Sequence, residues 1–274
     1  MKIKQLIFFE YSQDTTVAPQ LSTLMVVYFK SSTLLSTSTK MLPLSASSHP
    51  KVNNPLNQKL TGAIGVVLAA EKKETSKLFV PLRESGKLYK VDEHVMCAVS
   101  GIVADANYLV DEARIVAQQN LYSMHTPIYV EELVKNIANR KHVPTQFGSG
   151  RPFGVSLMYA GYDRVRGYQL YCSDPSGNYA AWNAHATGKN SVTTISTLKE
   201  EYKSDGSLED ALKLAVKVLA KSMDALKPTA DKFEIGVVHK DAHGNLVQRK
   251  VEGAELEKII ADAKVVEMKA NDKK

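Results

Sequence analysis

The chain has 274 residues, of which 44% are hydrophobic and 23% charged, proportions typical of a globular domain rather than a disordered chain. The formal net charge is +6, but Lys and Arg are interspersed with Asp and Glu, so the charge pattern argues against nucleic-acid binding. No apolar run approaches the roughly 20 residues that a membrane-spanning helix needs, so no membrane association is expected.

The first 60 residues differ in composition from the rest of the chain. Between Ser31 and Ser48, ten of the eighteen residues are Ser or Thr, and hydrophobic periodicity is absent. Such a segment cannot bury enough apolar surface to offset the entropy lost on ordering. We therefore expect residues 1–60 to be irregular, residues 61–266 to form the folded domain, and residues 267–274 to form a charged tail.

Three apolar runs predict strands at the start of the domain. Residues 64–70 form a compact run typical of a buried strand, and residues 88–91 and 94–100 predict two strands around the turn Asp92-Glu93. The apolar period then changes from that of strands to that of helices.

Two helices are predicted next. Apolar residues between Ala106 and Leu121 recur at i, i+3, i+4 and i+7, with Asp105 as the expected N-cap. A second helix is expected to begin near Pro127, since Pro is well tolerated in a first helical turn. Its apolar stripe runs from Val130 to Ala138.

Residues 151–188 read as strand, turn, strand, turn, strand. Along the first strand, Val155, Leu157 and Tyr159 alternate with other side chains, and a period of two buries one face. The residues Pro175-Ser176-Gly177 predict a tight turn, because Pro fixes φ and Gly accepts a positive φ. We expect Trp182 to anchor the sheet against a helix.

The remaining residues predict helices, a hairpin and a final helix. Helices are expected at residues 190–202 and from Ser207, where Ser207 and Asp210 resemble a capping box. Strands at residues 233–239 and 246–251 precede a helix at about residue 254 to residue 264. Because hairpins and helix pairs are segregated along the chain, we predict an α+β fold of two packed sheets with a helix pair on each outer face.

No residue pattern predicts a metal, nucleotide or other cofactor. Cys97 and Cys172 lie in apolar strand-like runs and are expected to be buried free thiols. His239 and His243 flank a predicted hairpin turn and lack a third ligand of suitable spacing. The segment Gly148-Ser149-Gly150 is not followed by the Lys-Ser/Thr pair of a phosphate-binding loop.

Residues 65–264 resemble the sequences of proteasome α-type subunits. Four stretches carry the resemblance: GVVLAAEKK at 65–73, SGIVADA at 100–106, TQFG at 145–148 followed by RPFGVSL at 151–157, and SDPSGNY at 173–179 with Trp182. The resemblance implies the four-layer αββα sandwich of the N-terminal nucleophile hydrolases. Turn and core chemistry accounts for the motif residues, so we favour a structural role for each: Arg151, Pro152, Phe153, Gly154, Asp174, Pro175, Ser176, Gly177 and Trp182.

A fold of this type can be a threonine peptidase, which requires a specific nucleophile. Such an enzyme needs a Thr at a free N-terminus, where the α-amine is the base, with Asp and Lys roughly 16 and 32 positions downstream. The candidate nearest a first strand is Thr61, but Leu60 replaces the Gly of catalytic relatives, and the two downstream positions hold Lys77 and Glu93. We predict a non-catalytic subunit; the alternative is an N-terminal-threonine peptidase.

The resemblance also implies partners and a location. Family members assemble into seven-membered α rings that dock onto β rings, gate substrate entry and receive the C-termini of the regulatory particle or other activators, in the cytoplasm and nucleus. The Lys that receives an activator carboxylate in the family aligns with Lys87, in the sequence ESGKL. A cation in a partly dry cleft suits a carboxylate, but a solvated charge at a strand edge is an equally good reading of Lys87.

The N-terminal segment departs from the family pattern. Residues 11–17 (YSQDTTV) resemble its opening motif in part, and the Gly-Arg-Leu-aromatic-Gln-Val-Glu-Tyr-Ala that follows in the family is missing. Codons for residues 25–34, read from the third base of the first codon, can encode Gly-Arg-Leu-Phe-Gln-Val-Glu-Tyr-Ala. We therefore hypothesise that residues 18–60 reflect a shifted frame or a retained intron, which predicts native N-terminal peptides containing Gln-Val-Glu-Tyr-Ala.

Overall fold

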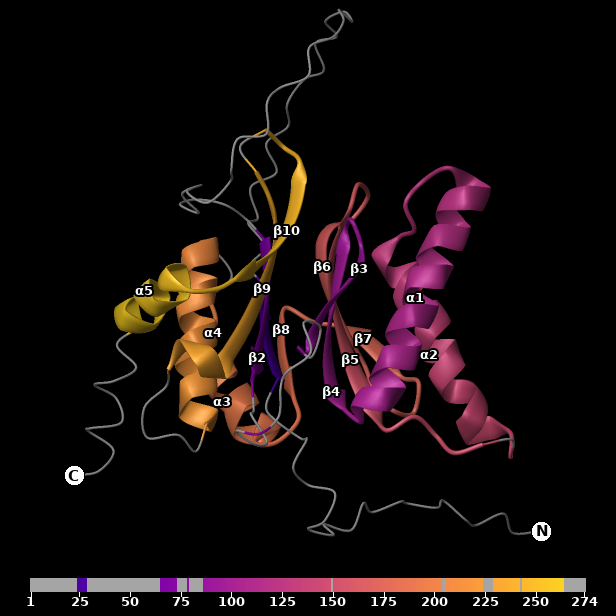
Figure 1. Ribbon diagram of the computed structural model, residues 1–274, viewed down its shortest axis with the longest axis horizontal. Helices are drawn as coiled ribbons and strands as arrows, with labels where there is room; N and C mark the ends of the chain where they lie inside the picture. Colours follow the sequence, from indigo (N-terminus) through magenta and orange to yellow (C-terminus); the bar gives the residue numbers. More distant parts are fainter. Residues whose placement is uncertain are drawn as a thin grey trace, which may run out of the picture.

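The structure is a computed structural model that describes residues 65–72, 78, 86–148, 150–203, 206–223, 229–241 and 243–263, together with the backbone of residues 24–28. Two five-stranded antiparallel sheets pack face to face, with helices on both outer sides (Figure 1). The predicted α+β class is therefore confirmed.

The two sheets differ in how their strands follow one another along the chain: all neighbours in the second sheet are consecutive, but only half of those in the first sheet are. The first sheet has the order β10 (Leu246–Val251), β9 (Phe233–Lys240), β2 (Gly65–Glu71), β1 (Leu24–Tyr28) and β8 (Ala184–Thr187). The second has the order β3 (Leu88–Asp92), β4 (Val95–Gly101), β5 (Val155–Asp163), β6 (Gly167–Ser173) and β7 (Tyr179–Ala181).

The helices divide into two groups (Figure 1). The second sheet is covered by α1 (Val103–Met124) and α2 (Val130–Gln146). The first sheet is covered by α3 (Ser191–Glu201), α4 (Leu208–Ser222) and α5 (Ala254–Asp262), and a short 3₁₀ helix, Ala230–Lys232, precedes β9. None of the described helices is long and apolar enough to cross a bilayer.

Three apolar clusters fill the spaces between the layers. On β5, Leu157 and Tyr159 belong to the cluster beneath α1 and α2, whereas Met158 and Ala160 belong to the cluster between the two sheets. The predicted period of two is thus present, but both faces of the strand are buried because each sheet is covered on both sides. The third cluster lies between the first sheet and α4.

The two cysteines are buried and free, and they belong to different clusters. Cys97 pairs in register with Tyr159 and lies in the cluster beneath the helices. Cys172 pairs with Met158 and lies in the cluster between the sheets. Because the two side chains leave opposite faces of one sheet, they cannot be joined by a disulfide without rebuilding the strands.

Two expectations about chain organisation need correction. The segment 1–60 was expected to be irregular, but its residues 24–28 form β1, which pairs antiparallel with β2 on one side and β8 on the other. The strands predicted within 151–188 do form a three-strand meander, β5–β6–β7, but the last stretch is divided in two, and its second part, β8, joins the first sheet. The other residues of 1–60 lie outside the described residues, and so does the tail 267–274. Most of the segment 18–60, to which the shifted-frame hypothesis applies, is therefore not described.

Helix starts also differ from the prediction. The first helix begins at Val103, its N-cap position is Ile102, and Asp105 lies within the first turn instead of capping it. The second helix begins at Val130, after Pro127. The capping box of α4 is confirmed: Ser207 Oγ accepts from the backbone N–H of Asp210, and the Asp210 carboxylate accepts from the backbone N–H of Ser207.

Candidate functional site

Lys87 directly precedes β3, and its backbone is fixed from two sides. Its N–H donates to Glu234 Oε2 at 2.7 Å, and its carbonyl accepts from the N–H of Val99 at 3.0 Å. This first contact joins the segment before β3, the edge strand of the second sheet, to β9, the second strand of the first sheet.

A small hollow of about 20 Å³ lies beside Lys87, lined by Gly86, Lys87, Tyr89, Val99, Gly101 and Val103. The Lys87 Nζ itself is buried. A hollow of this size holds about one water molecule. In the isolated chain, a carboxylate can therefore reach the ammonium only after the Lys87 side chain turns outward. In an assembled ring, a neighbouring subunit would add further walls to the hollow.

The motif at 151–154 ties the start of α1 to β5, next to this hollow. Arg151 makes two hydrogen bonds to the Asp105 carboxylate, at 2.6 and 2.7 Å, and the Gly154 N–H donates to the same carboxylate at 3.0 Å. The hydrogen bond from Arg151 is the main reason that the pKa of Asp105 is lowered. Gly101, which lines the hollow, has φ of 131°, and a Cβ there would collide with the Gly154 carbonyl.

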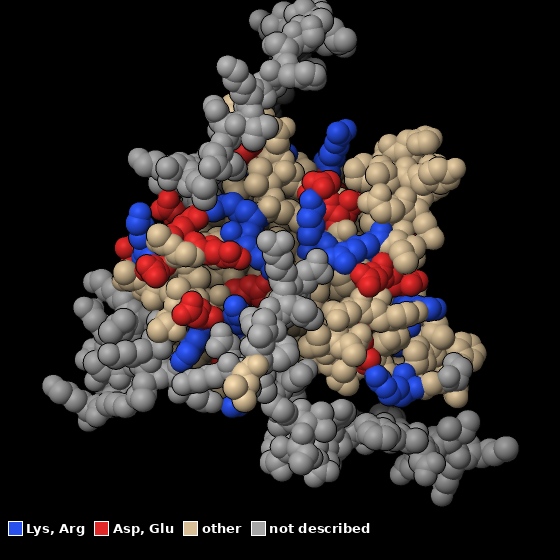
Figure 2. Space-filling model, viewed as in Figure 1, with Lys and Arg blue, Asp and Glu red and all other residues tan. Residues whose placement is uncertain are grey.

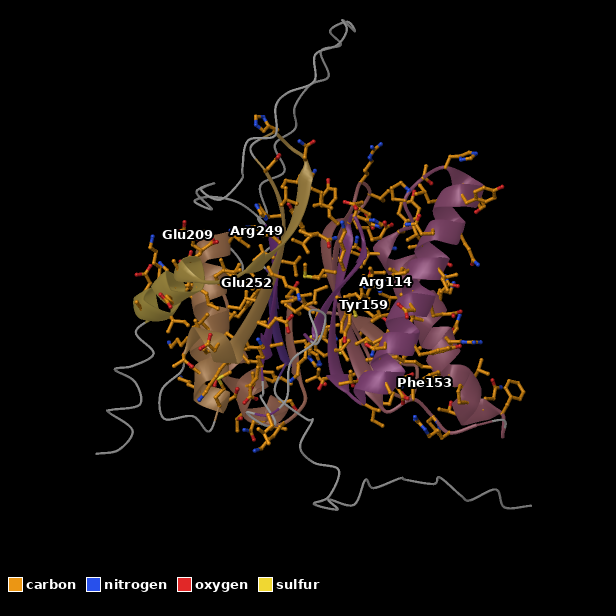
Figure 3. The ribbon with its side chains drawn as sticks, in the orientation of Figure 1. Arg114, Phe153, Tyr159, Glu209, Arg249 and Glu252 are labelled. Atoms are coloured by element: carbon orange, nitrogen blue, oxygen red, sulfur yellow. The ribbon has the colours of Figure 1, made fainter. Side chains whose placement is uncertain are left out.

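Phe153 extends this tie with an aromatic stack. Its ring lies 5.9 Å from that of Tyr108 on α1, and Arg140 on α2 donates to the Tyr108 hydroxyl at 2.6 Å. Figure 3 labels Phe153 at the end of the helical layer where α1 begins. Pro152 provides a carbonyl that accepts from Arg151 at 3.2 Å. The motif residues thus connect the first two turns of α1 to the start of β5.

The second motif forms the predicted turn and docks on α2. The Gly177 N–H donates to the Asp174 carbonyl at 3.0 Å, and Gly177 has φ of 88°. A Cβ at Gly177 would lie 2.7 Å from the Ala138 carbonyl of α2, so a residue with a side chain would force the turn off the helix. Pro175 and Ser176 are exposed, and a ring nitrogen of His142 on α2 approaches the Ser176 carbonyl at 3.3 Å.

The expectation for Trp182 was wrong. Its side chain remains 43% exposed and stacks on His185 at 4.2 Å, at the corner where β7 leads into β8. A large aromatic residue was expected to be buried, but this corner is the place where the chain passes from one sheet to the other. Trp182 therefore covers an edge rather than anchoring the sheet to a helix.

Helix α2 also contains a buried cation that was not predicted from the sequence. Lys141 is fully buried, and its Nζ donates to Ser173 Oγ at 2.8 Å and to the Val155 and Ser173 carbonyls at 3.1 and 3.2 Å. Burial lowers the pKa of Lys141 to about 8. The signal was available, because Lys141 follows Ile137 by four residues and so continues the apolar stripe of the helix.

Of the three positions considered for catalysis, only Glu93 lies among the described residues. Glu93 lies exposed in the β3–β4 turn and pairs with Lys90 at 2.6 Å, while Thr61 and Lys77 lie outside the described residues. His239 is buried on β9, and His243 lies in the turn that follows. No cluster of three or more potential metal ligands occurs among the residues that the structure describes.

The outer face of α1 exposes an unusual amount of apolar surface. Ile115 is 51% exposed, Met124 66% and Tyr122 85%, and Ile115 and Tyr122 line an open hollow on the helix. In Figure 2 the right-hand margin, where Figure 1 places α1, has few charged side chains near its upper end. An exposed apolar patch on a helix is typical of a surface that another protein covers.

Comparisons with known proteins agree with the motifs. A family profile described as "Proteasome subunit" matches residues 60–238. The chain is 50% identical over 175 residues to proteasome subunit alpha type-4 of Spinacia oleracea, covering 64% of this chain and 70% of the relative. It is 49% identical to alpha type-4-A of Arabidopsis thaliana, again over 64% of this chain and 70% of the relative. It is 48% identical over 189 residues to alpha type-4-1 of Oryza sativa subsp. indica, covering 69% of this chain and 76% of the relative. The chain therefore belongs to the proteasome subunit family, and it is similar to the alpha type-4 members of that family.

Proposed function

We propose that this chain is a non-catalytic subunit of the α ring of the 20S proteasome core, with the αββα sandwich of the N-terminal nucleophile hydrolases. The observation that carries the proposal is the identity of about one half to alpha type-4 subunits over 64–69% of the chain. The sequence supports the absence of catalysis, because Leu60, Lys77 and Glu93 stand where a threonine peptidase needs Gly, Asp and Lys.

The role of such a subunit is assembly, substrate gating and activator docking in protein degradation, and two surfaces support it. The apolar patch on α1 is suited to contact a β-ring subunit, because its apolar residues are exposed in the single chain and Arg114 is the one charged residue among the described residues that line its hollow. The Lys87 hollow at the sheet edge is suited to receive the C-terminal carboxylate of an activator once a neighbouring α subunit completes it.

Purification of the native particle tests the assembly proposal. We expect a tagged chain to co-purify with the other α and β subunits, and to be seen in both cytoplasm and nucleus by microscopy. Recovery of the chain as a folded monomer under conditions in which the other subunits assemble would contradict it.

Two further measurements address catalysis and docking. A peptidyl epoxyketone should label β subunits and leave this chain unlabelled, whereas labelling of a Thr here would support the peptidase alternative.

The Lys87→Ala particle should assemble normally but bind a regulatory-particle C-terminal peptide more weakly, because the carboxylate loses its cation.

A further inference from the structure

We propose that Glu234 on β9 is the positioning residue of the Lys87 pocket, holding the Lys87 backbone and setting the charge of the pocket together with Lys250. This inference rests on the activator docking proposed above. It identifies the residues, remote in sequence, that prepare the site for a carboxylate.

The first observation is the contact between Glu234 and Lys87. Glu234 Oε2 accepts from the Lys87 N–H at 2.7 Å, although the residues are 147 positions apart; Glu234 lies in β9 of the first sheet, and Lys87 precedes β3 of the second sheet. The Glu234 side chain is 11% exposed. A hydrogen bond from a backbone N–H to a poorly hydrated carboxylate is stronger than one between neutral groups, so the contact fixes the point from which the Lys87 side chain departs.

The second observation is the absence of a side chain at residue 86. A Cβ on Gly86 would collide with the Glu234 carboxylate. Gly86 and Glu234 therefore fit as a pair: the glycine leaves the space that the carboxylate fills. Because Val99 donates to the Lys87 carbonyl at 3.0 Å, the backbone on both sides of the pocket cation is fixed, which lowers the ordering cost of binding.

The third observation is the counter-charge on Glu234. Lys250 Nζ, from the edge strand β10, lies 2.7 Å from Glu234 Oε1. An unpaired carboxylate beside Lys87 would repel an incoming carboxylate, and Lys250 offsets this repulsion. Lys87, Glu234 and Lys250 together have a net charge of +1, which suits a ligand with one negative charge.

Four variants in assembled particles test the assignment, with binding measured for a fluorescent peptide that has the regulatory particle's C-terminal sequence. Glu234→Ala removes the acceptor and is expected to lower the affinity for the peptide with a free C-terminal carboxylate about tenfold, the effect of losing one hydrogen bond to a charged group. Glu234→Gln keeps an oxygen acceptor and should restore wild-type affinity or exceed it. Lys250→Gln leaves Glu234 uncompensated and should weaken binding, while its matched control Arg249→Gln, which breaks the pair with Glu255 instead, should not.

The same peptide ending in an amide separates positioning from mere support of the fold. If Glu234 only clamps the sheets, its variants should affect the acid and the amide equally, and that result would overturn the inference. Unchanged acid binding in Glu234→Ala and Lys250→Gln, with binding lost in Lys87→Ala, would overturn it while leaving the proposed docking intact. Unchanged binding in Lys87→Ala would refute the docking proposal itself, and with it the role of Glu234.

Discussion

Helices α1 and α4 cover opposite faces of the sandwich and expose different residues to solvent. In α4, every residue that is not buried is polar or charged, and nine of its fifteen residues are buried. In α1, six of twenty-two residues are buried, and the exposed ones include the apolar residues Val103, Tyr108, Ile115, Leu121, Tyr122 and Met124. The contrast indicates that α4 is complete within the single chain, whereas α1 has a face suited to a partner.

Helices α1 and α4 also differ in how their first turns are capped and in the partners of their charged residues. Helix α4 has a capping box, and Lys217 and Lys221 pair with Glu201 of α3 at 2.6 and 3.4 Å. Helix α1 has no side-chain cap, and its first-turn Asp105 is bonded to Arg151 of a distant loop. Figure 3 shows charged residues beside α4, α5 and β10, with Glu209, Glu252 and Arg249 labelled there. The start of α4 is therefore fixed by residues of its own first turn, and the start of α1 by the loop at 151–154.

The largest expected effect is a core substitution in α4. Leu219 is fully buried against the first sheet, so Leu219→Ala leaves a cavity and should lower the free energy of unfolding by about 2–5 kcal/mol. Urea unfolding of the full chain measures this. A loss below about 1 kcal/mol would mean that the α4 layer repacks easily and is not the self-sufficient part of the molecule.

A second test uses the buried cation of the other helical layer. The pKa of Lys141 is about 8 in the folded chain and 10.5 for an ordinary Lys. Below pH 8 both states are protonated and the burial cost is fully present. Between pH 8 and 10.5 the unfolded state binds more protons, so this residue makes the free energy of unfolding rise with pH, by an amount on the order of 3 kcal/mol.

Comparison with Lys141→Met isolates this contribution. Burial raises the pKa values of Cys97 and Cys172 to about 12. Above pH 9 these thiols therefore make the free energy of unfolding fall with pH, in the wild type and in Lys141→Met alike. We therefore expect the wild-type stability, measured relative to Lys141→Met by urea unfolding, to increase from pH 8 to pH 10.5. A difference that does not vary with pH would show that Lys141 titrates like an exposed Lys.

A smaller effect is expected at the cap of α4. Ser207→Ala removes the acceptor of the Asp210 N–H and should cost about 1 kcal/mol in thermal or urea unfolding. The exchange Ser207→Asp retains an acceptor at the N-cap and should restore most of the loss. Equal losses for both variants would argue that the capping box contributes little to the independence of α4.

Much of the fold could be predicted because its elements have long, regular patterns. The stripe of α4 and the alternation of β5 gave the right element types, since each depends on neighbours within one or two turns or strands. Asp105 was misassigned because a first-turn Asp fits a cap locally, and its actual partner, Arg151, is 46 residues away. Local patterns do not contain such pairings.

The N-terminal strand and the candidate pocket were harder to predict for the same reason. In β1, Leu24–Tyr28 is a five-residue strand whose pairing partners, β2 and β8, are distant in sequence. Lys87 could be identified only through the family resemblance, and its contact to Glu234 spans 147 residues. The shifted-frame hypothesis for residues 18–60 stays a prediction: a native peptide spanning Tyr28 to Lys40 as printed would exclude it.

The smallest expected effect on stability is the sharpest test of the two helical layers. Ile115 on α1 and Val192 on α3 are exposed aliphatic residues on opposite layers, 51% and 77% accessible. Because neither is buried, Ile115→Ser and Val192→Ser should each change the free energy of unfolding of the full chain by no more than about 0.5 kcal/mol. Their effects on assembly should differ: Ile115→Ser should lower the yield of chain incorporated into the particle several-fold, in quantitative mass spectrometry against a β subunit, because it puts a polar group into an apolar contact. Val192→Ser should incorporate like the wild type. Equal incorporation of both variants would mean that the apolar surface of α1 is not an assembly surface, and the difference between the layers would then have no consequence for function.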